Sequence, residues 1–466
     1  MRFTWKRMAA LGMSMVLLGS MAACGKEEAA APGAAAQSGS EAKETETETK
    51  AGEREESKEQ ESRPPHPSGP VTIQLWHGNS GVNEEYILSV VDDFNKTNGY
   101  GITVEATYAG KYPEILSKTS TAIASGDAPH IIMMSSTGIP MMAETGALAD
   151  MSEYIARDGL DMDNFVSSML DFCYYQDQIV TLPYQRSVPI LYYNKTMFDE
   201  FGLKAPESFE DLTQISKAIY EKSEGKTAGA GFLIDMFFYQ EALIRSLGAD
   251  GILAADGSGP ACLDDGSMER VLKDWREGIE AGYFCKVEVT NTSSIMKEDL
   301  YNGELGAMLS TSGNLGNFTE QFESLDYELG VCAMPVYGGL GGNIGGGNLG
   351  IIASGHSEDE IGASWEFMKF MMEDQQVAKC AIETGYLPVT YSSTKTDALK
   401  AQWEANPNYR IAFDILDQCS ESSWCVYQNE YESYLKQAAS YVIQDFSWTP
   451  EEAVEYLKEQ AKIVFQ

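Results

Sequence analysis

The sequence predicts an α/β fold, because short segments with strand-like apolar patterns are separated by a segment with helical spacing. Apolar and polar residues alternate over 71–75, as in a strand with one buried face. Over 87–94, apolar residues recur at i, i+3, i+4 and i+7, the spacing of an amphipathic helix. Residues 102–106 alternate again, and 131–134 form a short apolar run. Strands that alternate with helices are typical of a parallel sheet.

Two later helices have clear start signals. Ser357 and Glu360 have the spacing of a capping box, in which each side chain accepts a backbone N–H of the other residue. The apolar-rich segment 361–372 follows this pair. Thr449 and Glu452, with a proline between them, form a second capping box. We therefore expect one helix after each pair.

The start of the chain has the features of an export signal. Basic residues within 1–7 precede a mostly apolar run over 8–23, and small residues stand directly before Cys24. The run is too short, and too interrupted by glycine and serine, to span a membrane comfortably. Residues 21–24 resemble a lipobox, so we expect a signal peptide over 1–24 and lipidation of Cys24. An ordinary secretion signal, with Cys24 there by chance, is the alternative.

Residues 25–69 are expected to form a disordered acidic and proline-rich linker. This stretch has almost no large apolar residues, so it cannot bury enough surface to offset the entropy lost on ordering. Its charges and prolines favour an extended tether. Such a segment would serve as a spacer that lets the folded part extend away from its anchor.

The rest of the chain, from residue 70 onward, is long enough for two domains. The formal net charge of −37 argues against nucleic acid or anionic lipid as a target, because a negative surface repels phosphate. It also means that an anionic ligand needs a local basic residue in its site.

The eight cysteines do not form a recognisable framework. Without Cys24 their number is odd, they are widely spaced, and no C-x-x-C occurs. Buried thiols that behave as small apolar residues are the favoured interpretation, and a disulfide framework is the alternative.

No catalytic, metal or cofactor motif stands out, so we expect neither an enzyme nor a cofactor. Carboxylate pairs carry no information in a chain with 70 acidic residues. The four histidines lack metal-ligand spacing. Residues 345–350 match G-x-G-x-x-G, but the strand-like 351–353 follows instead of a helix. These glycines are better explained by a backbone that bends or approaches a ligand closely.

Several short motifs, in this order along the chain, carry a family resemblance. They are Leu75-Trp76-His77, Ala109-Gly110-Lys111-Tyr112, the segment Val188 to Lys195, Ala205 to Leu212, Ala307-Met308 with Ser312-Gly313, Thr384 to Val389, and the helix that begins at Thr449. With these pieces the chain resembles the extracellular solute-binding proteins of sugar-type ABC importers. Within that family it is most similar to the glycerol-3-phosphate-binding branch, with maltose-binding protein as a more distant relative.

The resemblance implies two α/β lobes, each a mixed sheet flanked by helices, with the ligand cleft at the hinge between them. Hinge crossings are expected near 186–189 and 345–350. Lobe 1 would then comprise 70–186 and 346–388, and lobe 2 would comprise 187–345 and 389–466. Hinge bending would close the lobes around the ligand.

The resemblance also implies a set of ligand-binding residues. Tyr112 and Tyr386 fall on ligand-contacting positions, and Phe237 falls on a cleft tryptophan, although plain core packing explains Phe237 equally well. Ser187 and Ser312 resemble serines that bind ligand, and Gly345 or Gly346 resembles a backbone donor. Aromatic faces and polar groups together suit a sugar ring.

This chain departs from the glycerol-3-phosphate branch at two positions. Ser136 stands where that branch has a glutamate, and the segment from Trp424 to Asn429 lacks its late arginine. Arg186 could supply the missing charge or form a structural salt bridge. These departures lower the expectation of glycerol-3-phosphate and raise that of a neutral saccharide, with Trp424 or Tyr427 as a stacking platform.

The sequence therefore predicts an import receptor anchored by Cys24 to the outer face of the cell membrane. Its expected partners are a carbohydrate or a glycerol-phosphate-like ligand and the ABC permease subunits, and the receptor itself is expected to be a monomer. Two alternatives are a secreted glycan-processing enzyme, which would consume its ligand, and an adhesion or sensory module built on the same fold.

Overall fold

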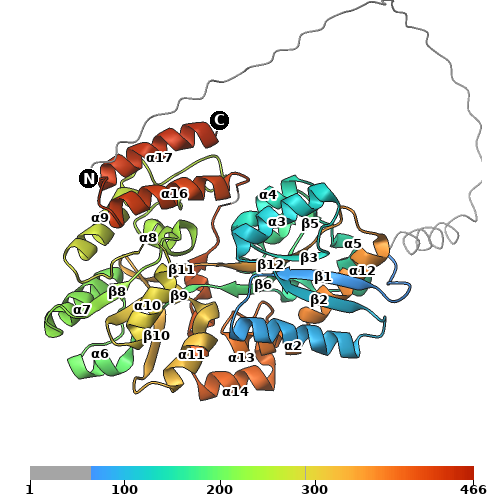
Figure 1. The fold of residues 1–466 in the computed structure, drawn as a ribbon, viewed down its shortest axis with the longest axis horizontal. Helices are drawn as coiled ribbons and strands as arrows, with labels where there is room; N and C mark the ends of the chain where they lie inside the picture. Colours follow the sequence, from blue (N-terminus) through green and yellow to red (C-terminus); the bar gives the residue numbers. More distant parts are fainter. Residues whose placement is uncertain (1–63, 289, 424, 466) are drawn as a thin grey trace, which may run out of the picture. The chain divides into compact units, whose positions relative to one another are not determined.

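The computed structural model describes residues 64–288, 290–423 and 425–465, which contain two main β-sheets with helices packed on each (Figure 1). Cys24, most of the expected linker and Trp424 lie outside these residues. The predicted α/β class is confirmed. Within the described ranges, no helix combines the length and the apolar character needed to cross a bilayer.

The first sheet has the strand order β2-β1-β3-β12-β6. Its strands are β1 (Thr72–His77), β2 (Thr103–Tyr108), β3 (Ile131–Ser135), β6 (Leu182–Ser187) and β12 (Gly345–Ile351). The first three strands pair in parallel, as the sequence predicts, whereas β12 runs antiparallel to both of its neighbours. The sheet is therefore mixed, and its antiparallel strand β12 comes from a later part of the chain.

The β3 run is apolar throughout because both faces of this strand are covered. Ile131 and Met133 belong to the larger core, whereas Ile132 and Met134 belong to a second, smaller core. Alternate residues of a strand point to opposite faces, so a strand buried on both sides needs no polar positions. The helices of this part are α2 (Val82–Thr97), α3 (Tyr112–Ser125), α4 (Ile139–Glu144), α5 (Ser152–Asp158), α12 (Glu358–Met371) and α13 (Asp374–Thr384).

The second sheet has the order β13-β11-β10-β7-β9-β8. Its strands are β7 (Pro189–Asn194), β8 (Ala228–Gly231), β9 (Leu305–Thr311), β10 (Leu329–Val336), β11 (Gly339–Asn343) and β13 (Cys419–Ser420). A separate hairpin is formed by β4 (Tyr174–Tyr175) and β5 (Gln178–Ile179).

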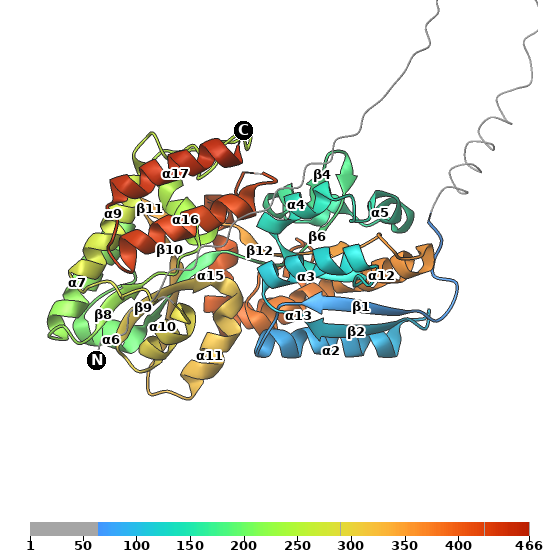
Figure 2. The same cartoon turned by 45° about the horizontal axis from the view of Figure 1, so that its top comes forward.

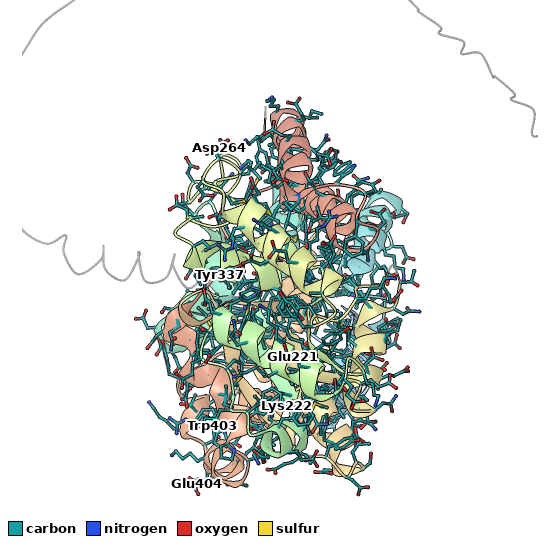
Figure 3. The ribbon with its side chains drawn as sticks, turned by 90° about the vertical axis from the view of Figure 1, so that its left-hand side faces the viewer. Glu221, Lys222, Asp264, Tyr337, Trp403 and Glu404 are labelled. Atoms are coloured by element: carbon teal, nitrogen blue, oxygen red, sulfur yellow. The ribbon has the colours of Figure 1, made fainter. Side chains whose placement is uncertain are left out.

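The remaining helices come from several stretches of the chain (Figure 2). They are α6 (Lys195–Phe201), α7 (Phe209–Lys222), α8 (Glu241–Ser246), α9 (Ser267–Glu280), α10 (Thr292–Tyr301), α11 (Leu315–Glu323), α14 (Asp397–Ala405), α15 (Asn408–Asp414), α16 (Gln428–Ile443) and α17 (Pro450–Val464). Some contact strands of the second sheet, others pack on those helices, and α14 packs mainly on α13. Glu221 and Lys222, labelled in Figure 3, are exposed at the end of α7, whereas Leu212 and Ile219 are buried. This division follows the amphipathic pattern of the helix.

The two predicted capping boxes are confirmed. The Ser357 and Thr449 side chains accept the backbone N–H groups of Glu360 and Glu452, and each glutamate accepts a backbone N–H in return. Helices α12 and α17 follow directly.

The chain passes from the first sheet to the second between β6 and β7, and it returns between β11 and β12. The expected strand after the glycines is confirmed at Ile351, but β12 begins earlier, at Gly345, and contains the glycines. Gly346 has φ +94°, and a β-carbon there would lie 2.3 Å from the carbonyl oxygen of Gln185. Gln185 itself has φ 50°, at a bulge in the β6–β12 pairing. Only glycine fits this close approach without strain.

The last residues of the expected linker are held against the folded part. Arg157 donates to the carbonyl oxygens of Pro64 and Pro65, and His66 Nδ1 lies 2.8 Å from Glu366 Oε1. The linker expectation is therefore corrected at its end, because these polar contacts with α5 and α12 offset the entropy of ordering the segment.

All seven cysteines in the described ranges are free. Cys173, Cys262, Cys380 and Cys425 are buried, and the others are half-buried. The favoured interpretation, thiols packed as small apolar groups, is confirmed.

Candidate ligand-binding site

A cavity of about 730 Å³ is lined by residues from both sheets and from the crossing segments. Helix α3 and the residues after β3 line one side, and the turn Met236–Gln240 (η5), β9 and α16 line the other. The crossing segments contribute Ser187 and the stretch from Asn343 to Gly346. Strand and helix ends from both lobes thus converge on one space.

Most of the sequence-predicted site residues lie in this cavity. The lining includes Tyr112, Ser136, Ser187, Phe237, Gly345, Gly346 and Tyr386. Phe237 is only 2 % exposed, so it contributes to the core as well as to the wall. The structure does not describe Trp424.

Ser312 and Tyr427 are placed elsewhere. Ser312 is fully buried behind the lining residue Thr311, and its Oγ accepts the backbone N–H of Val188 at 3.3 Å. Tyr427 is exposed at the start of α16 and contacts Phe465 edge-on. Neither residue forms part of the cavity wall.

Arg186 is the neighbour of the lining residue Ser187, and its charge is already paired. The side chain is fully buried, Nη1 donates to Asn348 Oδ1 at 2.9 Å, and Nη2 forms an ion pair with Glu421. Burial lowers the pKa of Arg186 to about 10, which leaves the guanidinium protonated at neutral pH. The ion pair joins β6 of the first sheet to the segment after β13 of the second sheet.

Three charged residues in the cavity wall were missed by sequence reasoning. They are Asp235, which caps η5 by accepting the Phe238 N–H at 3.2 Å, and Glu432 and Lys436 of α16. Lys436 Nζ lies 2.8 Å from Glu432 Oε1. The i, i+4 spacing on one helix was a visible signal, but such pairs are frequent on solvated helix faces. Nothing local connects them with Asp235.

Glu432 is poised to titrate near neutral pH. Burial and the nearby Asp235 carboxylate raise its pKa to about 7, against the opposing effect of Lys436. A carboxyl whose pKa is higher in the folded than in the unfolded state destabilises the fold as pH rises. Here that loss runs from the ordinary value of 4.5 up to about 7.

Glu432→Gln is therefore expected to raise the free energy of unfolding at pH 8 by about 1–3 kcal/mol and to leave it nearly unchanged at pH 4. Asp235 remains as a counter-charge for Lys436. Urea unfolding at the two pH values measures the difference, with Glu430→Gln as the control on an exposed residue of the same helix. An equal difference at both pH values would contradict the assignment.

The aromatic walls need glycines beside them. A β-carbon at Gly345 would lie 2.5 Å from the Phe238 ring, and one at Gly347 would lie 2.9 Å from the Tyr112 hydroxyl. Burial raises the pKa of Tyr112 to about 12, so this hydroxyl stays protonated and can donate a hydrogen bond. The glycines therefore leave the rings free to face the cavity.

His130, His356 and Glu360 form a cluster outside the cavity that the sequence spacing did not predict. Their potential metal-ligating atoms lie within 4.8 Å of one another. However, the backbone N–H of Gln74 donates to His130 Nδ1 at 3.0 Å, so the neutral ring carries its proton on Nε2, facing Glu360. Burial, followed by the charge of His356, lowers the pKa of His130. In this tautomer His130 has no free lone pair for a metal ion.

Comparisons with known proteins agree with this architecture. The family model for bacterial extracellular solute-binding proteins matches residues 89–410. The sn-glycerol-3-phosphate-binding periplasmic protein UgpB of Pectobacterium atrosepticum is 25% identical over 363 residues, which cover 73% of this chain and 78% of that protein.

Two solved structures share the fold. UgpB from Mycobacterium tuberculosis in complex with glycerophosphocholine has a TM-score of 0.75 and 18% identity, over 85% of this chain and 98% of that one. Maltose-bound MalE3 from T. maritima has a TM-score of 0.73 and 19% identity, over 84% and 99%. At these identities the likeness establishes the fold alone.

Proposed function

Because this chain belongs to the bacterial extracellular solute-binding protein family, we propose that it captures a carbohydrate in its interlobe cavity and delivers it to an ABC permease. The family and the relatives above are binding proteins rather than enzymes. The observation that carries the proposal is a cavity with several aromatic rings, many hydroxyl and amide groups, and only one lysine among its described lining residues. This mixture suits the apolar faces and the hydroxyl groups of a sugar ring.

The charge of the wall favours a saccharide over a phosphate. Lys436 is paired with Glu432, and Arg186, which is not among the lining residues, is paired with Glu421. A phosphate group binds best to free cationic donors, and Asp235 and Glu432 would repel it. The second candidate is glycerol-3-phosphate or a glycerophosphodiester, which the relatives' ligands and the presence of Lys436 in the wall support.

Ligand capture would work by population shift. A ligand that touches both lobes makes more contacts when the lobes are closed, so it favours the closed state, and the permease would bind that state. The lobe limits given above, at the two crossings, are part of this proposal. The ion pair between Arg186 and Glu421 joins the lobes close to the crossing strands.

We also propose that Cys24 is lipidated and holds a monomeric receptor at the outer face of the cell membrane. The support is the export-signal pattern of residues 1–24 and the sequence of the linker. The contacts of residues 64–66 with α5 and α12 would make the tether leave the protein from the first lobe.

A thermal-shift screen of the chain from residue 64 onward tests the ligand class. The panel contains neutral mono- and oligosaccharides, glycerol-3-phosphate and glycerophosphodiesters. A ligand at a hundred times its Kd should add about 2.7 kcal/mol of stability. Stabilisation by a neutral sugar, recovered unchanged after incubation, is the expected result. Stabilisation by the phosphates alone would favour the second candidate, and turnover of a glycan would contradict the receptor.

A further inference from the structure

Hydrogen-bond acceptors gather around η5 at one part of the cavity wall. Asp235 caps this turn, and the Asn343 Nδ2 group donates to the carbonyl oxygen of Phe237 in the same turn. Helix α16 also packs on η5 and brings Glu432 to the wall. Acceptor side chains from η5's own cap, from β11 and from α16 therefore line the cavity next to one short segment.

The Asn343 side chain is held by its amide nitrogen, and its oxygen has no partner in the protein. Asn343 is 2 % exposed, and its Nδ2 group also donates to Ser422 Oγ at 3.0 Å. Asn343 belongs to the cavity lining, and its Oδ1 is buried without a hydrogen-bond partner. A buried acceptor without a donor is costly, which points to a ligand that brings an N–H or O–H group.

When Asp235 and Glu432 are both ionised, the lining carries one carboxylate in excess. Asp235 and Glu432 face a single ammonium group, that of Lys436, and the ion pair is made with Glu432. The nearby arginines do not neutralise the extra carboxylate, because Arg186 pairs with Glu421 and Arg245 pairs with Glu241. A neutral ligand leaves this excess in place, and an anionic ligand increases the repulsion. A cationic ligand removes it.

We propose that the ligand is an amine-bearing saccharide or polyol, whose ammonium group is received between Asp235 and Glu432 while Asn343 Oδ1 accepts a further N–H or O–H. The rings of Phe238 and Tyr239, which also line the cavity, can face the cation. This inference rests on the proposed receptor function and names its ligand class.

Proton release accompanies such binding. Burial and Asp235 raise the pKa of Glu432 to about 7, so this carboxyl is largely protonated at pH 6.5. An ammonium group beside it favours the ionised form, and the proton leaves to the buffer. A neutral sugar produces little proton release.

The experiment compares matched probes by isothermal titration calorimetry at pH 6.5. Glucosamine, glucose and N-acetylglucosamine form one set, and galactosamine, galactose and N-acetylgalactosamine form another. We expect the amines to bind at least about tenfold more tightly than the acetylated forms. Runs in buffers of different ionisation enthalpy should show roughly half a proton or more released per amine bound.

The variant Asp235→Asn tests whether the Asp235 carboxylate binds the ammonium group. Asparagine can still cap η5, so the turn is preserved. The amine affinity should fall by about tenfold, with the affinity for the neutral members unchanged. Glu430→Gln removes the same charge from an exposed position of α16 and should change neither affinity.

The possible outcomes distinguish failure of the amine inference from failure of the receptor function. If neutral or acetylated members bind as tightly as the amines, the amine inference is overturned and the receptor function stands. If no member of either set binds, the amine inference is overturned as well, and the receptor function then depends on the wider sugar panel. Amine preference without loss in Asp235→Asn would overturn the assigned position.

Discussion

Arg186→Met is expected to lower the free energy of unfolding by about 3–5 kcal/mol. Arg186 is fully buried and the Glu421 side chain is 1 % exposed, so the substitution leaves a carboxylate buried without its partner. Asn348 also loses a hydrogen bond to its Oδ1. A loss of this size is a large fraction of the stability of a typical domain.

Urea unfolding of the ligand-free protein measures this loss. Arg410→Met is the matched control, because Arg410 forms an exposed ion pair with Asp414 and should cost no more than about 1 kcal/mol. The double variant Arg186→Met with Glu421→Gln removes both charges and should recover part of the loss. A loss below about 1 kcal/mol for Arg186→Met would show that the ion pair does not hold the hinge segments together.

Tyr112→Ala is expected to weaken ligand binding by about 2 kcal/mol or more, a factor of roughly thirty, with a small effect on stability. The ring lines the cavity at the first position of α3, where alanine is a good helix former. Tyr112→Phe keeps the ring but removes the hydroxyl, so it should lose only about 1 kcal/mol of binding free energy.

Calorimetric titration with the ligand found in the screen measures both variants. Tyr391→Ala serves as the control, since Tyr391 is 43 % exposed and lies outside the cavity lining. Unchanged affinity in Tyr112→Ala would remove this residue from the site. Equal losses in Tyr112→Ala and Tyr112→Phe would assign the effect to the hydroxyl rather than to the ring.

The site residues that the sequence did not predict depend on partners that are far away along the chain. Tyr112, Ser187 and Tyr386 were found through motifs that belong to a family, and all three line the cavity. Arg186 was assigned two possible roles, and only the position of Glu421, far along the chain, shows that its charge is already paired.

The sequence by itself determined the elements and their class. Each of the patterns that predicted an element involves residues that are close together in the sequence, so it can be recognised without the structure. These patterns are the alternation over 71–75, the helical spacing over 87–94 and the capping boxes at Ser357 and Thr449. The features of the expected export signal are also contiguous, and the signal stays a prediction.

The tertiary structure alone decided which polar groups share a space. Asp235 and Glu432 lie almost two hundred positions apart, yet both face one cavity, and burial together with their mutual repulsion raises the pKa of Glu432. A pKa depends on distances through space and on desolvation, and neither quantity can be predicted from the spacing of residues in the sequence. The same reason explains why β12 begins among glycines: its pairing with β3 and β6, and not its own residues, makes it a strand.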